Sequence, residues 1–252
     1  MANPYFTTGK VSEKEFFKSG VSESPSLVKI KIKLMEPSSK PFRPGQFCTF
    51  RVAEGIFRAY SIASDYKNFE EYDFLISCGH EGIGSNFFRN LQVGDRVNFL
   101  GPNGHFKIQL PIAEEVFFLA TGTGIAPFIP MIEFLLDNNC SSKIHLIHGF
   151  RNEANLEYYK SIHEDLKNRC PNFFSKIYIS KPEGSINGYT KGRITDEVKS
   201  MDLEKLTNAQ FYLCGHPDMI SEVSELLINA DIPHENIILE AFTSPGAYEK
   251  IA

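Results

Sequence analysis

Two glycines flank one threonine in Gly122-Thr123-Gly124, between a buried apolar run and a stretch with helical periodicity. A turn at the start of a helix offers free backbone N–H groups and the positive end of the helix dipole to a dinucleotide pyrophosphate. Glycine suits this position because a Cβ atom would hold the phosphates away from the backbone. Pro127 stands in place of the third glycine of G-x-G-x-x-G. The motif alone is therefore equally compatible with a tight turn that binds nothing.

Cationic residues follow the next two predicted strands, where many dinucleotide-binding proteins carry an acid for the ribose. Arg151 follows residues 143–150, Ser180-Lys181 ends the strand after that, and Arg193 lies farther along the chain. Three cations at one sheet edge could hold the 2′-phosphate that distinguishes NADP from NAD. A solvated charged rim explains the same spacing about as well.

A cysteine ends a later predicted strand, in Cys214-Gly215-His216-Pro217-Asp218. Ligands bind at the carboxyl ends of parallel strands, so a ligand could reach this cysteine. A small buried residue that completes a strand is the ordinary role of a free cysteine. No base other than the adjacent histidine is near, and we exclude a cysteine hydrolase.

The segment Arg58-Ala59-Tyr60-Ser61 alternates like a strand, so its arginine and tyrosine share one face. Arginine can grip a diphosphate, and tyrosine can stack on a planar ring. Ser61, on the other face, could reach a ring nitrogen. A short helix predicted to open at Gly84-Ser85 offers a second anion site. By itself the tetrapeptide is also compatible with an ordinary strand.

Alternating apolar and polar residues over the first half of the chain predict short strands that form an antiparallel β-barrel. The predicted strands are 28–34, 46–52, 57–63, 72–78 and 95–100. From about residue 114 strands alternate with helices, which predicts a parallel five-stranded sheet covered on both faces. Its strands are 114–120, 143–150, 174–180, 209–215 and 235–242, and two of its helices fill 193–200 and 217–229. We therefore expect a barrel domain over 1–110 and an α/β domain over 111–252.

The composition, 42% hydrophobic and 23% charged, is that of a globular protein and not of a disordered chain. The longest apolar run is broken by Pro127, Pro130 and Glu133, and the first residues do not resemble a signal peptide. The five cysteines are odd in number and lack C-x₂-C spacing, which favours reduced thiols over a zinc or iron–sulfur site. Any metal centre is therefore expected on another protein.

Eight segments occur in an order that resembles the ferredoxin/flavodoxin–NADP⁺ reductase family, and most closely its bacterial, FAD-containing branch. They are PGQF (44–47), RAYSIAS (58–64), GIGS (82–85), VGD (93–95), GPNGHF (101–106), ATGTGIAP (120–127), CGHPDM (214–219) and EAF (240–242). The match covers nearly the whole chain. It implies that FAD binds the barrel and NADP binds the α/β domain.

The resemblance also implies roles in FAD binding. Arg58 would bind the pyrophosphate, Tyr60 would stack on the isoalloxazine ring, and Ser61 would hydrogen-bond to the flavin N5 that exchanges hydride. Ala241 and Phe242 would cover the flavin on the face opposite Tyr60. The expected FAD-binding residues are Arg58, Ala59, Tyr60, Ser61, Leu75, Ile83, Gly84, Ser85, Thr123, Ala241 and Phe242.

The family pattern further implies a catalytic set of Ser61, Cys214 and Glu240 where nicotinamide meets flavin. The expected NADP-binding residues are Gly122, Gly124, Arg151, Ser180, Lys181, Arg193, Gly215 and Asp218. Lys181 stands where the family often has arginine, and lysine cannot make the bidentate phosphate contact. NADPH is still expected over NADH. Ten residues follow Phe242, and the sequence leaves open whether this tail folds over the cofactors.

The implied function is transfer of hydride between NADP(H) and FAD, and of single electrons to or from ferredoxin or flavodoxin. Alternatives are an NAD(P)H-dependent reductase component of a multi-component oxygenase, and a free-flavin reductase. A non-enzymatic subunit of a larger redox complex is disfavoured by the intact Ser61, Cys214 and Glu240. We expect a cytoplasmic monomer that binds neither nucleic acid nor membranes.

Overall fold

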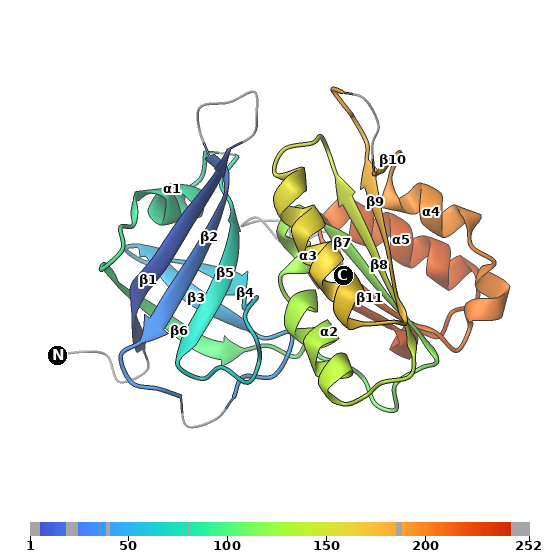
Figure 1. Cartoon of the computed structure of the whole chain (residues 1–252), viewed down its shortest axis with the longest axis horizontal. Helices are drawn as coiled ribbons and strands as arrows, with labels where there is room; N and C mark the ends of the chain where they lie inside the picture. The colour runs from blue at the N-terminus through green and yellow to red at the C-terminus, as the bar shows by residue number, and fades with distance from the viewer. Residues whose placement is uncertain (1–5, 19–24, 39–40, 80, 185–187, 243–252) are drawn as a thin grey trace. The chain divides into compact units, whose positions relative to one another are not determined.

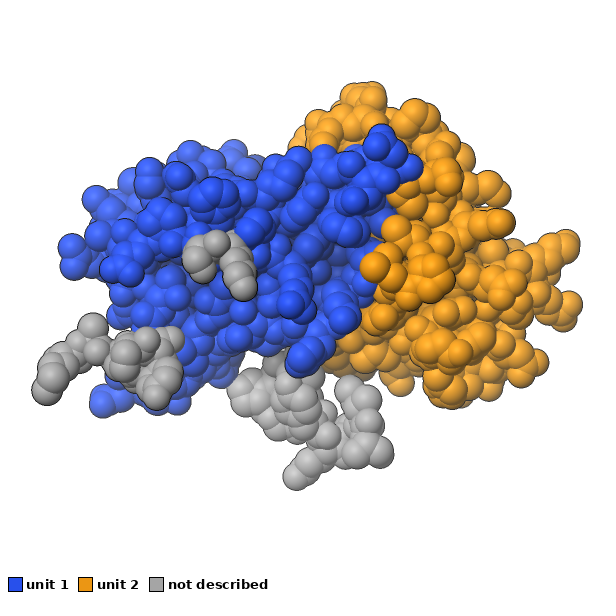
Figure 2. All heavy atoms as spheres, turned by 90° about the horizontal axis from the view of Figure 1, so that it is seen from below, with its two compact units in different colours: residues 1–108, 126–139, 154–158 blue, residues 109–125, 140–153, 159–252 orange. Residues whose placement is uncertain are grey.

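Residues 6–18, 25–38, 41–79, 81–184 and 188–242 are described in a computed structural model of the chain (Figure 1). Its contacts divide the chain into two units. Unit 1 comprises residues 1–108, 126–139 and 154–158, and unit 2 comprises residues 109–125, 140–153 and 159–252 (Figure 2). The expected boundary between residues 110 and 111 stays a prediction. The tail after Phe242 lies outside the described residues.

Unit 1 contains an antiparallel sheet of six strands in the order β4-β3-β6-β1-β2-β5. The strands are β1 (Thr7–Lys18), β2 (Pro25–Leu34), β3 (Phe47–Ala53), β4 (Ile56–Ser61), β5 (Glu71–Ser77) and β6 (Arg96–Asn103). A bridge between Ile62 and Phe74 joins the two edge strands, and the Ala63 N–H donates to the Asp73 carbonyl at 2.8 Å. The sheet therefore closes into the predicted barrel.

Strand β1 was not predicted, although the other five strands were. Val11 is its one fully apolar buried side chain, whereas Glu13, Glu15 and Phe16 are exposed. The strand exists because it pairs with β2 on one side and β6 on the other. Its own residues show too little alternation to predict it.

Phenylalanines fill the centre of the barrel. The ring of Phe50 lies 5.0 Å from Phe74, 5.1 Å from Phe99 and 5.2 Å from Phe88, all measured between centroids. Phe88 belongs to helix α1 (Ile83–Asn90), which connects β5 to β6. Burial of this ring anchors α1 on the barrel and places the start of the helix beside β4.

Unit 2 contains a parallel sheet in the order β10-β9-β8-β7-β11-β12. Its strands are β7 (Glu115–Thr121), β8 (Lys143–Phe150), β9 (Phe173–Ile179), β10 (Thr190–Lys191), β11 (Gln210–Gly215) and β12 (Ile237–Ala241). The five predicted strands are confirmed, but the expected count of five was wrong by one. Strand β10 has only two residues, both exposed, and so shows no periodicity.

Helices cover both faces of this sheet. Helices α4 (Ile194–Ser200) and α5 (Pro217–Asn229) pack with Phe117, Leu119 and Phe211 on one face. Helix α3 (Leu156–Arg169) contacts the other face through His163 and Tyr159. Helix α2 (Phe128–Asp137) follows β7 in sequence but belongs to unit 1. Among the described helices, none is long and apolar enough to cross a membrane.

Candidate active site

One group of predicted residues meets at the start of α1 in unit 1. A Cβ atom placed on Gly84 would overlap the hydroxyl of Tyr60 and lie 3.5 Å from Cγ of Arg58. Phe88 supports Tyr60 from the helix side, with 4.7 Å between ring centroids. Burial raises the pKa of Tyr60 to about 12, so its hydroxyl stays protonated. The fold thus brings Arg58, Tyr60 and Gly84 together.

The N-terminus of α1 suits an anion. No acidic residue lies in its first turn, and no side chain caps it at Gly82. The leading N–H groups of a helix have no intrahelical partner and carry the positive end of its dipole. Arg58 adds a cation, held by a 2.7 Å hydrogen bond from its Nη1 to the Phe57 carbonyl. A diphosphate therefore fits this cradle, and a side chain at Gly84 would disturb it by colliding with Tyr60.

The other predicted FAD-binding residues of unit 1 lie on β4, β5 and α1. Ser61 ends β4 and is buried. The Ser85 hydroxyl donates to the Ser77 carbonyl at 3.1 Å, which fastens α1 to β5. Ala59 is exposed, Leu75 is buried, and Ile83 is exposed at the first position of α1. Their roles stay predictions.

A second group lies in unit 2, where the turn Gly122–Ile125 meets the end of β11. A Cβ atom on Gly124 would overlap the carbonyl oxygen of Cys214 and lie 2.7 Å from its carbonyl carbon. One on Gly215 would lie 2.9 Å from both the N and O atoms of Thr121. Glycine is required at both places because the two chain segments touch. The glycines keep side chains out of this part of the strand ends, which fits the close approach of a dinucleotide.

Cys214 and Glu240, two of the three predicted catalytic residues, are register neighbours on β11 and β12. Gly215 is likewise opposite Ala241, and the Phe242 N–H donates to the Gly215 carbonyl at 3.0 Å. The structure therefore brings these five residues together beside the Gly122–Ile125 turn. Ser61, the third, lies in unit 1. The assignment of Thr123, Ala241 and Phe242 to FAD stays a prediction.

Cys214 is a neutral thiol. Its side chain is fully buried, and burial, with a smaller effect of Glu240, raises its pKa well above the ordinary value. His216 is exposed at the start of α5, and its Nδ1 accepts from the Asp218 N–H at 3.2 Å. It therefore caps a helix instead of activating the thiol, in agreement with the exclusion of a cysteine nucleophile.

The predicted phosphate ligands collect at the ends of β8 and β9. The Lys181 N–H donates to the Arg151 carbonyl at 2.7 Å. The Ser180 N–H donates at 3.0 Å to the carbonyl of Phe150, the last residue of β8. The Gly192 N–H donates to the carbonyl of Ile179, the last residue of β9, at 2.9 Å. This bond puts Arg193 at the same edge. All three cationic side chains are exposed. Arg151, Lys181 and Arg193 therefore form a basic rim at the ends of β8 and β9, and this rim is open to an anionic ligand.

Glu153 is a residue that sequence reasoning missed. Its carboxylate accepts from the N–H groups of Glu183 at 3.0 Å and Gly184 at 3.1 Å, and from the Tyr189 hydroxyl at 2.8 Å. These bonds, that of Glu183 foremost, lower the pKa of Glu153 to about 2. The residue therefore shapes the loop that begins at Lys181. Its partners come from a distant segment, so no local pattern indicated it.

Two buried histidines were also missed. His148 of β8 is fully buried, with Nε2 at 2.8 Å from the Gly122 carbonyl oxygen and Nδ1 at 3.1 Å from Nε2 of His163 on α3. Burial foremost, and His163 next, lower the pKa of His148 well below its ordinary value, and burial lowers that of His163 to about 4. The segment KIHLIHGF predicts a strand and includes His148, but nothing in it indicates that His163 is the partner of that histidine.

Acid is therefore expected to destabilise the protein as the pH falls from about 6.5 to about 4. His163 binds a proton in the unfolded chain below its ordinary pKa, but in the folded protein only below about 4. Stability is thus full above about pH 6.5, and this histidine alone removes about 3 kcal/mol by pH 4. Urea unfolding across this range measures the loss. His163→Gln should flatten the pH dependence, and an unchanged slope would contradict the assignment.

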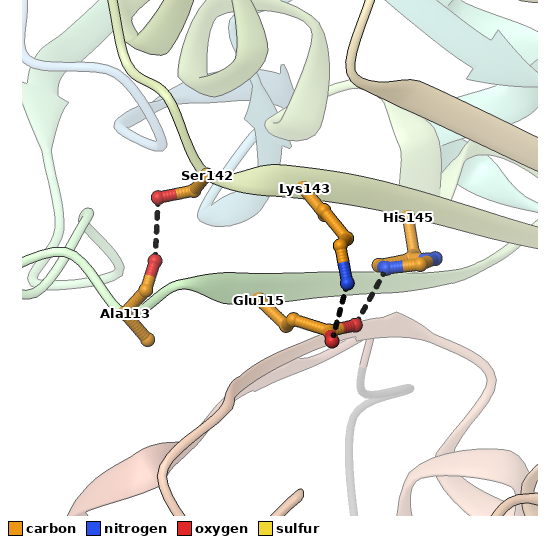
Figure 3. Close-up of polar contacts among 5 residues, drawn as sticks. All are labelled: Ala113, Glu115, Ser142, Lys143 and His145. Atoms are coloured by element: carbon orange, nitrogen blue, oxygen red, sulfur yellow. Dashed lines mark hydrogen bonds and ion pairs between the residues drawn. The ribbon is translucent and has the colours of Figure 1, made fainter.

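Polar contacts also fasten the opposite end of the parallel sheet (Figure 3). Glu115 accepts from Lys143 at 3.1 Å and pairs with Nε2 of His145 at 3.0 Å, while the Ser142 hydroxyl donates to the Ala113 carbonyl at 2.5 Å. These residues join the first residues of β7 and β8, whereas the glycine turn follows the last residue of β7. They are structural and lie apart from the candidate site.

Two family models match the chain. One, described as an oxidoreductase FAD-binding domain, matches residues 17–108, and the other, an oxidoreductase NAD-binding domain, matches residues 118–225. The first contains the α1 cradle, and the second contains the glycine turn and Cys214. The two matches therefore cover the α1 cradle and the Gly122–Ile125 turn, whereas Glu240, Ala241 and Phe242 lie beyond the second match.

The toluate 1,2-dioxygenase electron transfer component of Pseudomonas putida is 31% identical over 223 residues, covering 88% of this chain and 65% of that protein. The chain thus spans less than two thirds of that relative. The flavodoxin/ferredoxin–NADP reductase of Buchnera aphidicola is 31% identical over 205 residues, which are 75% of this chain and 80% of that protein. A ferredoxin NADP⁺ reductase from Neisseria gonorrhoeae, solved with FAD and NADP, has the same fold, with a TM-score of 0.76 at 22% identity over 96% of this chain and 100% of that one.

Proposed function

The chain belongs to the ferredoxin/flavodoxin–NADP⁺ reductase-like family of FAD- and NAD(P)-dependent electron-transfer reductases, and from this premise we propose that it is the reductase component of a multi-component oxygenase. The observation that carries the proposal is the 31% identity to the toluate dioxygenase component over 88% of the chain. Ferredoxin or flavodoxin as sole partner, the first expectation from sequence, becomes the second candidate.

The residues of unit 1 would bind FAD through its diphosphate. Arg58 lies beside the start of α1, whose first N–H groups have no intrahelical partner, and a charge-assisted arginine–phosphate contact is stronger than a neutral hydrogen bond. Ser61 is held buried at the end of β4, where its hydroxyl would orient the ring. FAD, when bound, takes up two electrons from a nicotinamide and releases them one at a time.

The residues of unit 2 would hold the nicotinamide dinucleotide. The Gly122–Ile125 turn lets the ligand approach the backbone, and the neutral Cys214 thiol adds no charge that would repel it. Glu240, in register with Cys214, supplies the acidic group of this edge. The protein contributes position and electrostatics, and the cofactors contribute the redox chemistry.

The electron acceptor is proposed to be an iron–sulfur centre outside the two matched domains. The five cysteines of this sequence lack the spacing of a cluster motif. The four Cys48, Cys78, Cys170 and Cys214 are buried and lie in different parts of the fold. We further propose the domain boundary near residue 110 and a cytoplasmic monomer.

The test begins with reconstitution of the whole chain with FAD and anaerobic stopped-flow mixing with NADH and NADPH in turn. Bleaching of the flavin is expected with at least one of them. The reduced protein is then offered an oxygenase ferredoxin, a flavodoxin and free FMN. Fastest reduction of the oxygenase ferredoxin supports the proposal. A preparation that takes up no FAD, or that reduces only free FMN, would overturn it.

The second candidate is a ferredoxin/flavodoxin–NADP⁺ reductase. Identity of 31% to the Buchnera enzyme, of which the chain covers 80%, favours it. Faster reduction of flavodoxin than of the oxygenase ferredoxin in the same assay would establish this candidate in place of the first.

NADPH is proposed as the preferred donor, because the rim at the ends of β8 and β9 carries Arg151, Lys181 and Arg193. The double variant Lys181→Ala, Arg193→Ala is expected to raise the KM for NADPH about tenfold or more and that for NADH little. Arg193 also faces Glu222 at 3.8 Å, but exposed pairs of this kind contribute little.

Steady-state KM values for both nucleotides measure this preference. Lys205→Ala is the matched control, since Lys205 is an exposed cation of the same unit and pairs with Asp202 away from the rim. An equal rise for NADPH and NADH in the double variant would defeat the 2′-phosphate assignment.

A further inference from the structure

His148 and His163 form a hydrogen-bonded chain that ends on the backbone of the glycine turn. Nε2 of His148 lies 2.8 Å from the Gly122 carbonyl oxygen, and Nδ1 lies 3.1 Å from Nε2 of His163. His148 is completely buried and His163 is 4% exposed. The bond between the two imidazoles is worth more at this depth than at the surface, since an unpaired buried polar group is costly.

The direction of every bond in this chain follows from the carbonyl. A carbonyl oxygen only accepts, so Nε2 of His148 must carry the hydrogen. The neutral ring then has a bare Nδ1, which accepts, and Nε2 of His163 must donate to it. Nδ1 of His163 is left as a bare acceptor, and it has no hydrogen-bond partner among the described residues. Both rings therefore take the Nε2–H tautomer.

The carbonyl that His148 contacts belongs to a residue whose backbone conformation glycine adopts readily and other residues rarely do. Gly122 has a φ of +53°, in the left-handed region. The next glycine, Gly124, is already pressed against the backbone of Cys214. The His148 N–H therefore fixes the peptide between Gly122 and Thr123, while packing against Cys214 fixes Gly124 at the other end of the turn. Thr123 lies between these two points.

We propose that His148 is a positioning residue for nicotinamide dinucleotide binding: it fixes the Gly122–Gly124 turn through the Gly122 carbonyl, and His163 holds it in the required tautomer. The inference rests on the proposed function for the identity of the ligand, but not for the geometry of the turn. Neither histidine touches the ligand in this proposal. Their effect is to reduce the number of conformations that the turn must give up on binding.

Two substitutions test the donor. His148→Phe keeps an aromatic ring and removes the donor, whereas His148→Gln can donate from Nε2 and accept at Oε1. His148→Phe is expected to raise the KM for the preferred nucleotide about tenfold, the worth of one buried hydrogen bond, while FAD content is unchanged. His148→Gln should restore the KM to within about twofold of the parent. Equal values for the two variants would overturn the proposal.

His145→Gln is the matched control, because His145 lies on the same strand and is paired with Glu115 at the opposite end (Figure 3). It should leave the nucleotide KM at the parent value. A rise equal to that of His148→Phe would mean that any loss of a histidine from β8 perturbs the site, and would also overturn the proposal.

Nitrogen NMR of the parent protein provides a test that needs no activity. Both rings are expected as neutral Nε2–H tautomers, with a correlation across the His148–His163 bond, and a protonated Nδ1 on His148 would refute the assignment. Hydrogen exchange at the Thr123 and Gly124 amides should accelerate in His148→Phe and not in His148→Gln. If the parent fails to oxidise either nucleotide, the proposed function fails while this result still decides the positioning role.

Discussion

Replacing Gly124 by alanine is expected to lower kcat/KM for NAD(P)H oxidation about 100-fold or more while FAD remains bound. The added Cβ would overlap the Cys214 carbonyl oxygen and lie 2.7 Å from its carbon and 3.0 Å from Cα of Gly215. All of these are backbone or backbone-bonded atoms of a central strand, so the turn must move instead. A displacement of about 1 Å at a reacting group costs about two orders of magnitude in rate.

Stopped-flow reduction of the flavin measures this effect, and the absorbance of bound FAD shows whether unit 1 is intact. Gly184→Ala is the matched control. Gly184 also lies in a loop of unit 2, and no atom of the described residues comes closer than 3.9 Å to the position of its Cβ. A Gly124→Ala protein that reduces its flavin at the parent rate would show that the contact with β11 does not shape the dinucleotide site.

Replacing Gly84 by alanine is expected to weaken FAD binding about 30- to 100-fold, as the loss of roughly 2–3 kcal/mol of phosphate contacts would. The new methyl group would overlap the Tyr60 hydroxyl, and Tyr60 cannot retreat because Phe88 lies behind it with 4.7 Å between ring centroids. The start of α1 must then shift away from β4. Its N–H groups and Arg58 would no longer converge on one diphosphate.

Fluorescence titration of the apoprotein with FAD measures the affinity. Gly82→Ala serves as the control on the same helix terminus. Gly82 has an extended φ of −163°, and among the described residues the atom nearest to its added Cβ would be Ser85 Oγ at 3.9 Å. It should bind FAD like the parent. Retained affinity in Gly84→Ala would place the diphosphate somewhere other than the start of α1.

Much of the fold could be predicted because local periodicity carried it. Helix α5 was predicted over its observed residues, with Met219, Ile220 and Val223 on its buried face. Strands β7, β8 and β11 are mainly apolar runs, as expected for strands of a sheet that is covered on both faces. Strands β1 and β10 failed this rule, because their existence depends on pairing with β2, β6 and β9 and not on their own side chains.

The order of barrel and α/β domain, the position of the glycine turn and the family could all be read from the sequence, since they depend on local periodicity, on short motifs and on the order of these along the chain. The atoms that constrain that turn became visible in the folded protein alone. Gly124 is required because Cys214, far along the sequence, presses on it, and the Gly122 carbonyl is held by His148 and, behind it, His163. A contact between distant segments leaves no periodicity in either, so chain order alone could not reveal it.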